Sequence, residues 1–190
     1  MESVKDLLVK IKEKSELIVD LAYSALIFDS DDMAREVEKL ENEIDDLVYR
    51  IRIHTMLAAN NFEEAEQLAG ILQVADAANN LANAAADIVY LLDVDITMRP
   101  FLPSLLNQAD EKLHVVIITQ NSGIVNRTIG ELNVEAETGV RIIAIKRGKQ
   151  WIYDPEGNVG LKAGDVLIIR GTEDGFKFLE RVARGEESWD

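Results

Sequence analysis

Hydrophobic positions in the first half of the chain follow a heptad pattern. Over residues 4–25 and again over 33–58, mostly apolar residues recur at alternating intervals of four and three. This spacing aligns them along one side of a helix, where they can pack against neighbouring helices. The pattern therefore predicts two long helices. Their aligned positions are Val4, Leu8, Ile11, Ser15, Ile18, Ala22 and Ala25, then Met33, Val37, Leu40, Ile44, Leu47, Ile51, His54 and Ala58.

A third helix is predicted after these two. Asn61 and Glu64 have the spacing of a helix cap, and an alanine-rich stretch continues the helix to about Leu92. Small residues on its apolar face would let a neighbouring helix approach closely. This broad face comprises Ile71, Val74, Ala75, Ala78, Leu81, Ala82, Ala85, Ile88 and Val89.

Glycine and proline mark where the helical part ends. Only one of the 11 glycines lies in residues 1–110, so that part is expected to form long uninterrupted helices. The segment Arg-Pro-Phe-Leu-Pro at 99–103 ends them, and a short helical linker is expected to reach Asp110. We therefore predict an antiparallel three-helix bundle with its linker over residues 1–110 and a second domain over 111–190.

The second domain alternates strand and helix signals. A buried strand at 115–119 is followed by a short helix that Ser122 can cap. The remaining elements are a hairpin of strands 140–147 and 150–153, a strand at 166–170, and a helix at 173–184 capped by Thr172 and ended by Gly185. The order β-α-β-β-β-α describes a small α+β module. The whole chain is thus expected to be an α + α/β multidomain protein.

Charge narrows the function classes. The chain has a net charge of −15, and residues 1–110 alone hold 22 acidic and 9 basic residues. Such acidity argues against a nucleic-acid partner, because phosphate backbones need a basic surface. No cysteine, two histidines and no nucleophile motif leave little material for catalysis, so we predict no enzyme. The chain starts without a signal-peptide pattern, and we expect it to be cytoplasmic.

Three segments of the second domain carry a family resemblance. They are Thr128-Ile129-Gly130-Glu131-Leu132, then 139–148 (GVRIIAIKRG), then 161–171 (LKAGDVLIIRG). In this order and at these separations they resemble the TrkA-C domain, the C-terminal half of the RCK regulatory domain of potassium channels and transporters. The resemblance implies a dimeric cytoplasmic sensor that binds a small ligand and is coupled to cation transport.

The helical part resembles the PhoU family, whose repeat is a three-helix bundle. Members of that family often carry carboxylates at i,i+4 that hold metal ions. Glu41 and Asp45 keep this spacing on the second helix, and Asp76 stands where an acid of the third helix is expected, with Leu72 in place of its companion. A divalent metal at Glu41, Asp45 and Asp76 is one interpretation of these acids. The other is a solvated helix face.

A basic segment interrupts the acidic chain. Residues 138–153 contain no acid and four bases, of which Arg141 and Arg147 share a strand face. Arginine over an apolar floor suits an anionic nucleotide. Some TrkA-C members bind cyclic di-AMP at their dimer interface, and the resemblance places Arg141, Ile142 and Pro155 there, with Glu135 where some ligand-binding members carry a base. The alternative is that these charges protect an edge strand from aggregation.

Two functional hypotheses follow. The first is a non-enzymatic cytoplasmic regulatory subunit of a potassium or other cation channel or transporter. It would be a homodimer, it could lie peripheral to the membrane through that partner, and it would sense a small anionic ligand at Arg141, Ile142, Arg147 and Pro155. The second is a metal-binding PhoU-like regulator of phosphate transport or signalling. Because only one PhoU-like repeat is present, we also expect two chains to pair their bundles into six helices.

Overall fold

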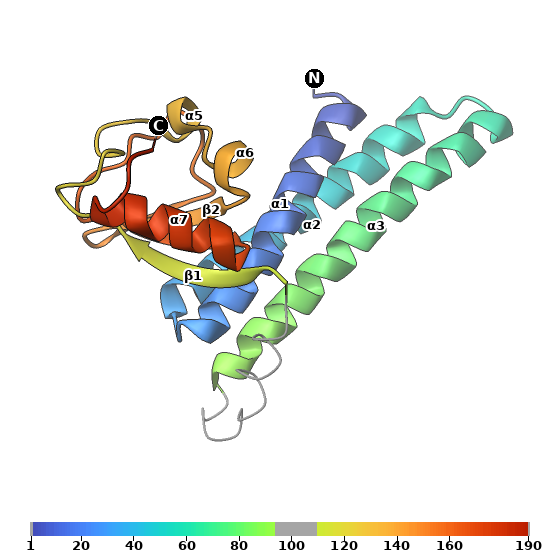
Figure 1. Cartoon of the computed structure of the whole chain (residues 1–190). Helices are drawn as coiled ribbons and strands as arrows, with labels where there is room; N and C mark the ends of the chain where they lie inside the picture. Colours follow the sequence, from blue (N-terminus) through green and yellow to red (C-terminus); the bar gives the residue numbers. More distant parts are fainter. Residues whose placement is uncertain (1, 94–109, 190) are drawn as a thin grey trace. The chain divides into compact units, whose positions relative to one another are not determined.

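Three long helices form the N-terminal part of the chain (Figure 1). They are α1 (Val4–Ile27), α2 (Asp31–Ala58) and α3 (Phe62–Tyr90), and the short 3-10 helix η1 (Leu91–Asp93) follows. The computed structural model describes residues 2–93 and 110–189, which we call the helical unit and the sheet unit. The predicted three-helix bundle is confirmed. The helix end predicted at 99–103 and the linker after it, up to residue 109, lie outside the described residues, and the boundary near 110 stays a prediction.

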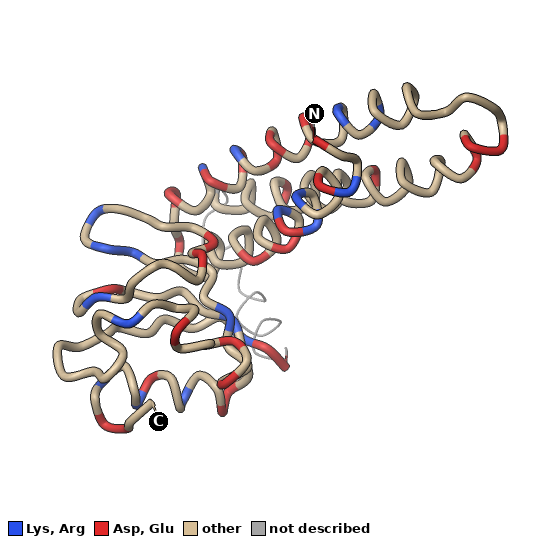
Figure 2. Tube along the Cα trace, turned by 90° about the horizontal axis from the view of Figure 1, so that it is seen from above, with Lys and Arg blue, Asp and Glu red and all other residues tan. Residues whose placement is uncertain are grey.

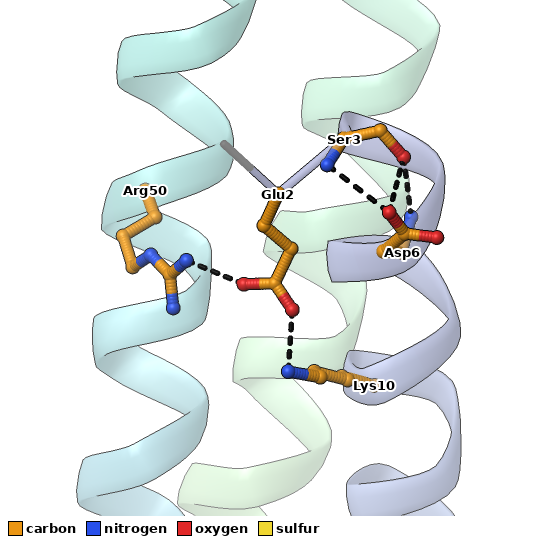
Figure 3. A network of polar contacts seen from close by, with 5 residues as sticks. All are labelled: Glu2, Ser3, Asp6, Lys10 and Arg50. Atoms are coloured by element: carbon orange, nitrogen blue, oxygen red, sulfur yellow. Dashed lines mark hydrogen bonds and ion pairs between the residues drawn. The ribbon is translucent and has the colours of Figure 1, made fainter.

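Side chains at the helix starts satisfy backbone groups that a helix leaves without partners. Ser3 and Asp6 form a capping box on α1, and Asn61 accepts a hydrogen bond from the backbone N–H of Glu64 at the start of α3, as its sequence predicts. Beside the first cap, the Glu2 carboxylate pairs with Lys10 and lies 2.5 Å from Arg50 of α2 (Figure 3). The pair with Arg50 connects the residues before α1 to α2, and the pair with Lys10 lies within the N-terminal segment itself.

The core of the helical unit follows the predicted heptads with local differences. On α1 the buried series begins at Leu7, while Leu8 is only half-buried. On α2 the predicted positions from Met33 to Ile51 are all buried, but Thr55 then takes the place expected of His54. A straight helix drifts by about 20° per heptad, so a seam read over several turns slips by one residue. The broad apolar face expected on α3 is wrong in part, because Val74 and Leu81 are exposed.

The sheet unit contains four antiparallel strands in the order β1-β4-β2-β3. They are β1 (Lys112–Ile117), β2 (Arg141–Arg147), β3 (Gln150–Tyr153) and β4 (Val166–Gly171). The helices α5 (Ile129–Leu132) and α6 (Val134–Thr138) connect β1 to β2, and α7 (Glu173–Arg184) follows β4 and lies along β1 (Figure 1). The predicted order is confirmed, with the first helix divided in two.

Two details of the sheet unit differ from the sequence expectation. The start expected for the first helix of this unit is wrong: Ser122 donates a hydrogen bond to the carbonyl of Val182, and Thr128 caps α5 instead. The first strand is only half-buried, because β1 lies at a sheet edge and Ile117 is 57% exposed on the face away from the core. The core on the other face includes Val116, Leu167 and Leu179.

No helix of the described ranges 2–93 and 110–189 is long and apolar enough to cross a membrane.

Candidate ligand-binding site

A hollow of about 210 Å³ lies where the chain enters β2 and leaves β3. Its walls come from the short helices α5 and α6, from the start of β2, and from the turn after β3. The residues that line it are Ile129, Val134, Glu135, Val140, Arg141, Ile142, Asp154 and Pro155. Three of the four residues predicted to bind a ligand, Arg141, Ile142 and Pro155, thus meet at one place.

A sharp reversal between α6 and β2 positions Arg141. Gly139 ends α6 with φ +68°, a conformation that side chains rarely adopt. The Thr138 hydroxyl donates to the carbonyl of Val134 at 2.6 Å and accepts from the N–H of Val140 at 3.1 Å. Val140 is thereby fixed in the core, and Arg141 follows it at the rim with 21% of its side chain exposed.

An irregularity in β2 brings the second wall close. The pairing between β2 and β4 shifts between Ile142 and Ala144, which leaves Ile143 as an extra residue. The carbonyl of Ile143 accepts a hydrogen bond of 2.9 Å from the N–H of Asp154. Asp154 has φ +43°, a left-handed conformation that aspartate tolerates better than most residues. The chain therefore turns at the end of β3 and places Pro155 in the wall of the hollow.

Two glycines hold the third wall. The N–H of Gly130 in α5 donates to the carbonyl of Gly157 at 2.7 Å. A Cβ atom on Gly130 would lie 2.9 Å from that carbonyl oxygen, so a larger residue would push the helix away from the loop after Pro155. This close approach fixes the distance between α5 and the turn.

The hollow combines one guanidinium with two carboxylates above an apolar floor. Arg141 NH2 lies 3.2 Å from Asp154 Oδ1, and the exposed Glu135 adds a second acid. A phosphate that binds Arg141 must therefore compete with Asp154 and approach Glu135. The hydrophobic residues that line the hollow are Ile129, Val134, Val140 and Ile142, of which all but Ile129 are buried.

Arg147, the fourth predicted ligand residue, does not line the hollow. Its Nε lies 2.8 Å from Asp165 Oδ1, and its NH2 lies 2.7 Å from both Asp165 Oδ2 and the Gly160 carbonyl. The Asp165 side chain is 1% exposed, and the pKa of Arg147 is raised by its hydrogen bonds to this carboxylate. Arg147 thus joins β2 to the turn before β4.

Asp154 is the charged residue that the sequence expectation missed. The hairpin register could have indicated it. Because Arg147 pairs with Gln150, counting back along both strands places Asp154 opposite Ile143, two residues from Arg141. Ile129, Val134 and Val140 carry no such signal, because an apolar residue of a pocket floor looks the same in sequence as one of the core.

The three acids proposed for a metal do not meet. Asp76 forms an ion pair of 2.6 Å with Arg52, and Asp87 is the acid of α3 that lies near Glu41. Since α2 and α3 run antiparallel, the 11 residues from Glu41 to Arg52 separate Asp76 from Glu41 by about 16 Å along the bundle. Within residues 2–93 and 110–189, no three His, Cys, Asp or Glu residues cluster closely enough to hold a metal ion.

The ionised carboxylate of Glu41 is destabilised by its surroundings. Burial raises the pKa of its carboxyl, and the carboxylates of Asp45 and Asp87 raise it further. An acid whose pKa is raised by folding stabilises the fold at low pH and loses that contribution as pH rises through its folded pKa. Glu41→Gln should therefore raise the free energy of unfolding at pH 7, by less than about 1 kcal/mol because water screens this site.

Urea unfolding at pH 7 and at pH 4 measures this difference. The gain from Glu41→Gln should shrink at pH 4, where the wild-type carboxyl is largely protonated. Glu13→Gln, at an exposed glutamate of α1, is the matched control and should change stability little at either pH. A loss of stability in Glu41→Gln at pH 7 would contradict a repulsion between Glu41 and the carboxylates of Asp45 and Asp87.

The two histidines of the chain lie in different units of the fold. His114 of β1 stacks on Phe176 of α7, with ring centroids 3.9 Å apart, and burial lowers its pKa. Its Nε2 lies 4.0 Å from Glu173. His54 is half-buried beside the core of the bundle.

Comparison with known families matches both units. The PhoU domain matches residues 8–92 and the TrkA-C domain matches residues 113–183. Over 77 residues the chain is 30% identical to "Probable potassium channel protein 2" of Methanocaldococcus jannaschii, which is 40% of this chain and 22% of that protein. Over 76 residues it is 34% identical to "Ktr system potassium uptake protein C" of Bacillus subtilis, again 40% of this chain and 34% of that protein. The chain thus spans only a minor part of these relatives.

Solved structures include the RCK_C domain dimer of S. agalactiae BusR in complex with cyclic di-AMP. It is 28% identical in sequence to this chain and superposes with a TM-score of 0.36. The match covers 38% of this chain and 95% of that chain. The two family models, unlike this solved structure, together match both the helical unit and the sheet unit. The chain combines a PhoU domain with a TrkA-C domain.

Proposed function

We propose that this chain is a non-enzymatic regulator of a potassium channel or transporter, and that its TrkA-C domain binds an anionic nucleotide in the hollow at Arg141. The observation that carries the proposal is the hollow itself: one guanidinium at the rim of an apolar floor, inside a TrkA-C domain. Cyclic di-AMP, which some TrkA-C members bind, is the first ligand to test. Its two phosphates suit Arg141, and its two adenines suit the apolar floor.

In this proposal the protein acts as a homodimer on the cytoplasmic side of the membrane. A ligand bound between two copies favours only the arrangement that completes its site, so binding shifts the population of dimer geometries. The PhoU domain passes that shift to the membrane partner. The relatives named for potassium channels and potassium uptake support potassium as the transported ion.

Thermal unfolding of the full chain tests the ligand. Each ligand of a panel is added in large excess: cyclic di-AMP, cyclic di-GMP, AMP, ATP, Mg²⁺ and Mn²⁺. A ligand at 100 times its dissociation constant stabilises the native state by about 2.7 kcal/mol. Cyclic di-AMP should raise Tm by several degrees, more than any mononucleotide. No shift with any nucleotide contradicts the proposal, and a shift with Mn²⁺ alone favours the metal-binding alternative.

Glu135 should weaken the binding of an anionic ligand. Its carboxylate lines the hollow but sits on an exposed surface, so its repulsion is worth well under 1 kcal/mol after screening. Glu135→Gln should increase the affinity for cyclic di-AMP about two- to threefold, and the gain should shrink as salt is added.

Glu137→Gln is the matched control for this prediction. Glu137 is exposed on the same short helix but does not line the hollow, so its substitution should leave affinity nearly unchanged. Isothermal titration of both variants in low and high salt measures the difference. Equal gains in the two variants would show that overall charge, and not the hollow, governs binding.

A further inference from the structure

Helix α3 carries two heptad series that are displaced by one residue. The first is packed inside the bundle and consists of Ala75, Ala78, Ala82, Ala85 and Val89. The second, which we call the outer seam, consists of Gln67, Gly70, Val74, Ala77, Leu81, Ala84 and Ile88. All of the outer seam except the half-buried Ile88 is exposed, including 58% of Val74 and 50% of Leu81. The bundle thus leaves a regular apolar face of α3 without a covering helix.

The outer seam is also nearly free of charge. Between Glu66 and Asp87 the only charged residue is Asp76, whose carboxylate is bound by Arg52 of α2. In a chain of net charge −15, two copies repel each other over most of their surface. Figure 2 shows red and blue residues along α1 and most of α2, a tan stretch at the end of α2, and red residues at the start of α3. The outer seam is a long surface along which two copies can approach with little of that repulsion.

When two outer seams are placed antiparallel, the sizes of their side chains are complementary. About a twofold axis between Val74 and Ala77, the central layers each place a larger side chain opposite a small one, while Ile88 at the end of the seam comes opposite Glu63. Leu81 faces Gly70 of the second copy, Val74 faces Ala77, and Gln67 faces Ala84. These are the layers in which antiparallel coiled coils place one a and one d position.

Gly70 gives an independent indication of close approach. Glycine inside a helix costs about 1 kcal/mol relative to alanine. A Cβ atom at Gly70 would meet nothing within 4 Å, so packing inside the described bundle does not require glycine there. Opposite Leu81 of a second copy, the missing side chain makes room for the leucine.

We propose that a second copy of this chain docks antiparallel along the outer seam, with α3 against α3. The two three-helix bundles then meet through their α3 helices. The side-chain amides of Gln73 and Asn80 flank the seam and face each other across it. This pairing does not depend on the ligand proposed above, so either proposal can fail while the other stands.

Cysteine pairs test the register directly, because the chain contains no cysteine of its own. Two differently tagged chains are coexpressed, one with Gly70→Cys and the other with Leu81→Cys, and oxidised. In the proposed register the two cysteines share a layer, within the distance that a disulfide can span. Like cysteines lie 11 residues apart along the axis, about 16 Å, which is too far. We therefore expect heterodimeric crosslinks and almost no homodimeric ones.

A matched pair uses Val9→Cys, an exposed apolar position of α1, in place of Gly70→Cys. It should crosslink at most weakly with Leu81→Cys. Homodimeric Gly70→Cys crosslinks would show a parallel arrangement and overturn the proposal. Crosslinking of the main pair no stronger than that of the Val9 pair would also overturn it. Both substituted positions are exposed, so circular dichroism should show unchanged helix content in every variant.

Discussion

Replacing Arg147 by alanine should lower the free energy of unfolding of the sheet unit by about 3–5 kcal/mol. The substitution removes a two-pronged ion pair with Asp165, whose carboxylate is almost fully buried. The remaining acid would be left in the interior with a single backbone donor, the N–H of Lys162. Breaking a buried pair costs this much because one charge stays uncompensated.

Tryptophan fluorescence during urea unfolding measures this loss selectively. Both tryptophans of the chain, Trp151 and Trp189, lie in the sheet unit, so the signal does not report on the helical unit. Lys149→Ala, in the exposed turn next to Arg147, should change stability by less than 0.5 kcal/mol, roughly the range of surface substitutions.

A double variant tests whether the stability loss of Arg147→Ala comes from the unpaired buried charge of Asp165. Arg147→Ala combined with Asp165→Ala should cost less than the two single changes added together, because neither charge is then left alone. A loss below about 1 kcal/mol in Arg147→Ala would contradict a structural role for this residue. In that case Arg147 would be a cation of the β2–β3 hairpin whose ion pair does not stabilise the fold.

Replacing Arg141 by alanine should weaken cyclic di-AMP binding by about 10- to 150-fold. A hydrogen bond to a charged group contributes about 1.5–3 kcal/mol, and Arg141 is the base that lines the hollow. The variant should still fold, because the pair between Arg141 and the 45% exposed Asp154 contributes little to stability. Affinity and stability thus respond to different arginines of the same strand.

Arg141→Lys and Lys149→Ala serve as controls in the same titration. Lysine keeps the charge but not the planar fork that matches a phosphate, so most of the affinity should still be lost. Lys149→Ala removes a charge outside the hollow and should leave affinity almost unchanged. Equal weakening by Lys149→Ala and Arg141→Ala would indicate general charge attraction without a specific site.

Local signals predicted most of the fold because each depends on neighbouring residues. Asn61 and Thr172 cap helices as expected, and Gly185 ends α7 with φ +76°. Such local signals do not distinguish the environments of Arg141 and Arg147. Both are basic residues of one strand, but one lies at the rim of a hollow and the other binds Asp165, 18 residues further along the chain. Only the tertiary structure separates the two.

The acids of the bundle show that local spacing also does not predict which residues of two helices face each other. Spacing identified Glu41 and Asp45 as neighbours on α2, because an i,i+4 relation is local. Which acid of α3 faces them depends on the length of the turn between the helices. The ion pair of Arg52 with Asp76 sets a register in which Asp87 lies near Glu41.

Isothermal titration of the full chain with cyclic di-AMP tests the central claim most directly, because it yields affinity and stoichiometry together. A site completed by two copies predicts saturation at one ligand for two chains, with binding lost or severely weakened in Arg141→Ala. No heat of binding at millimolar ligand, confirmed by an unchanged Tm, would contradict the claim. So would saturable binding that Arg141→Ala leaves intact.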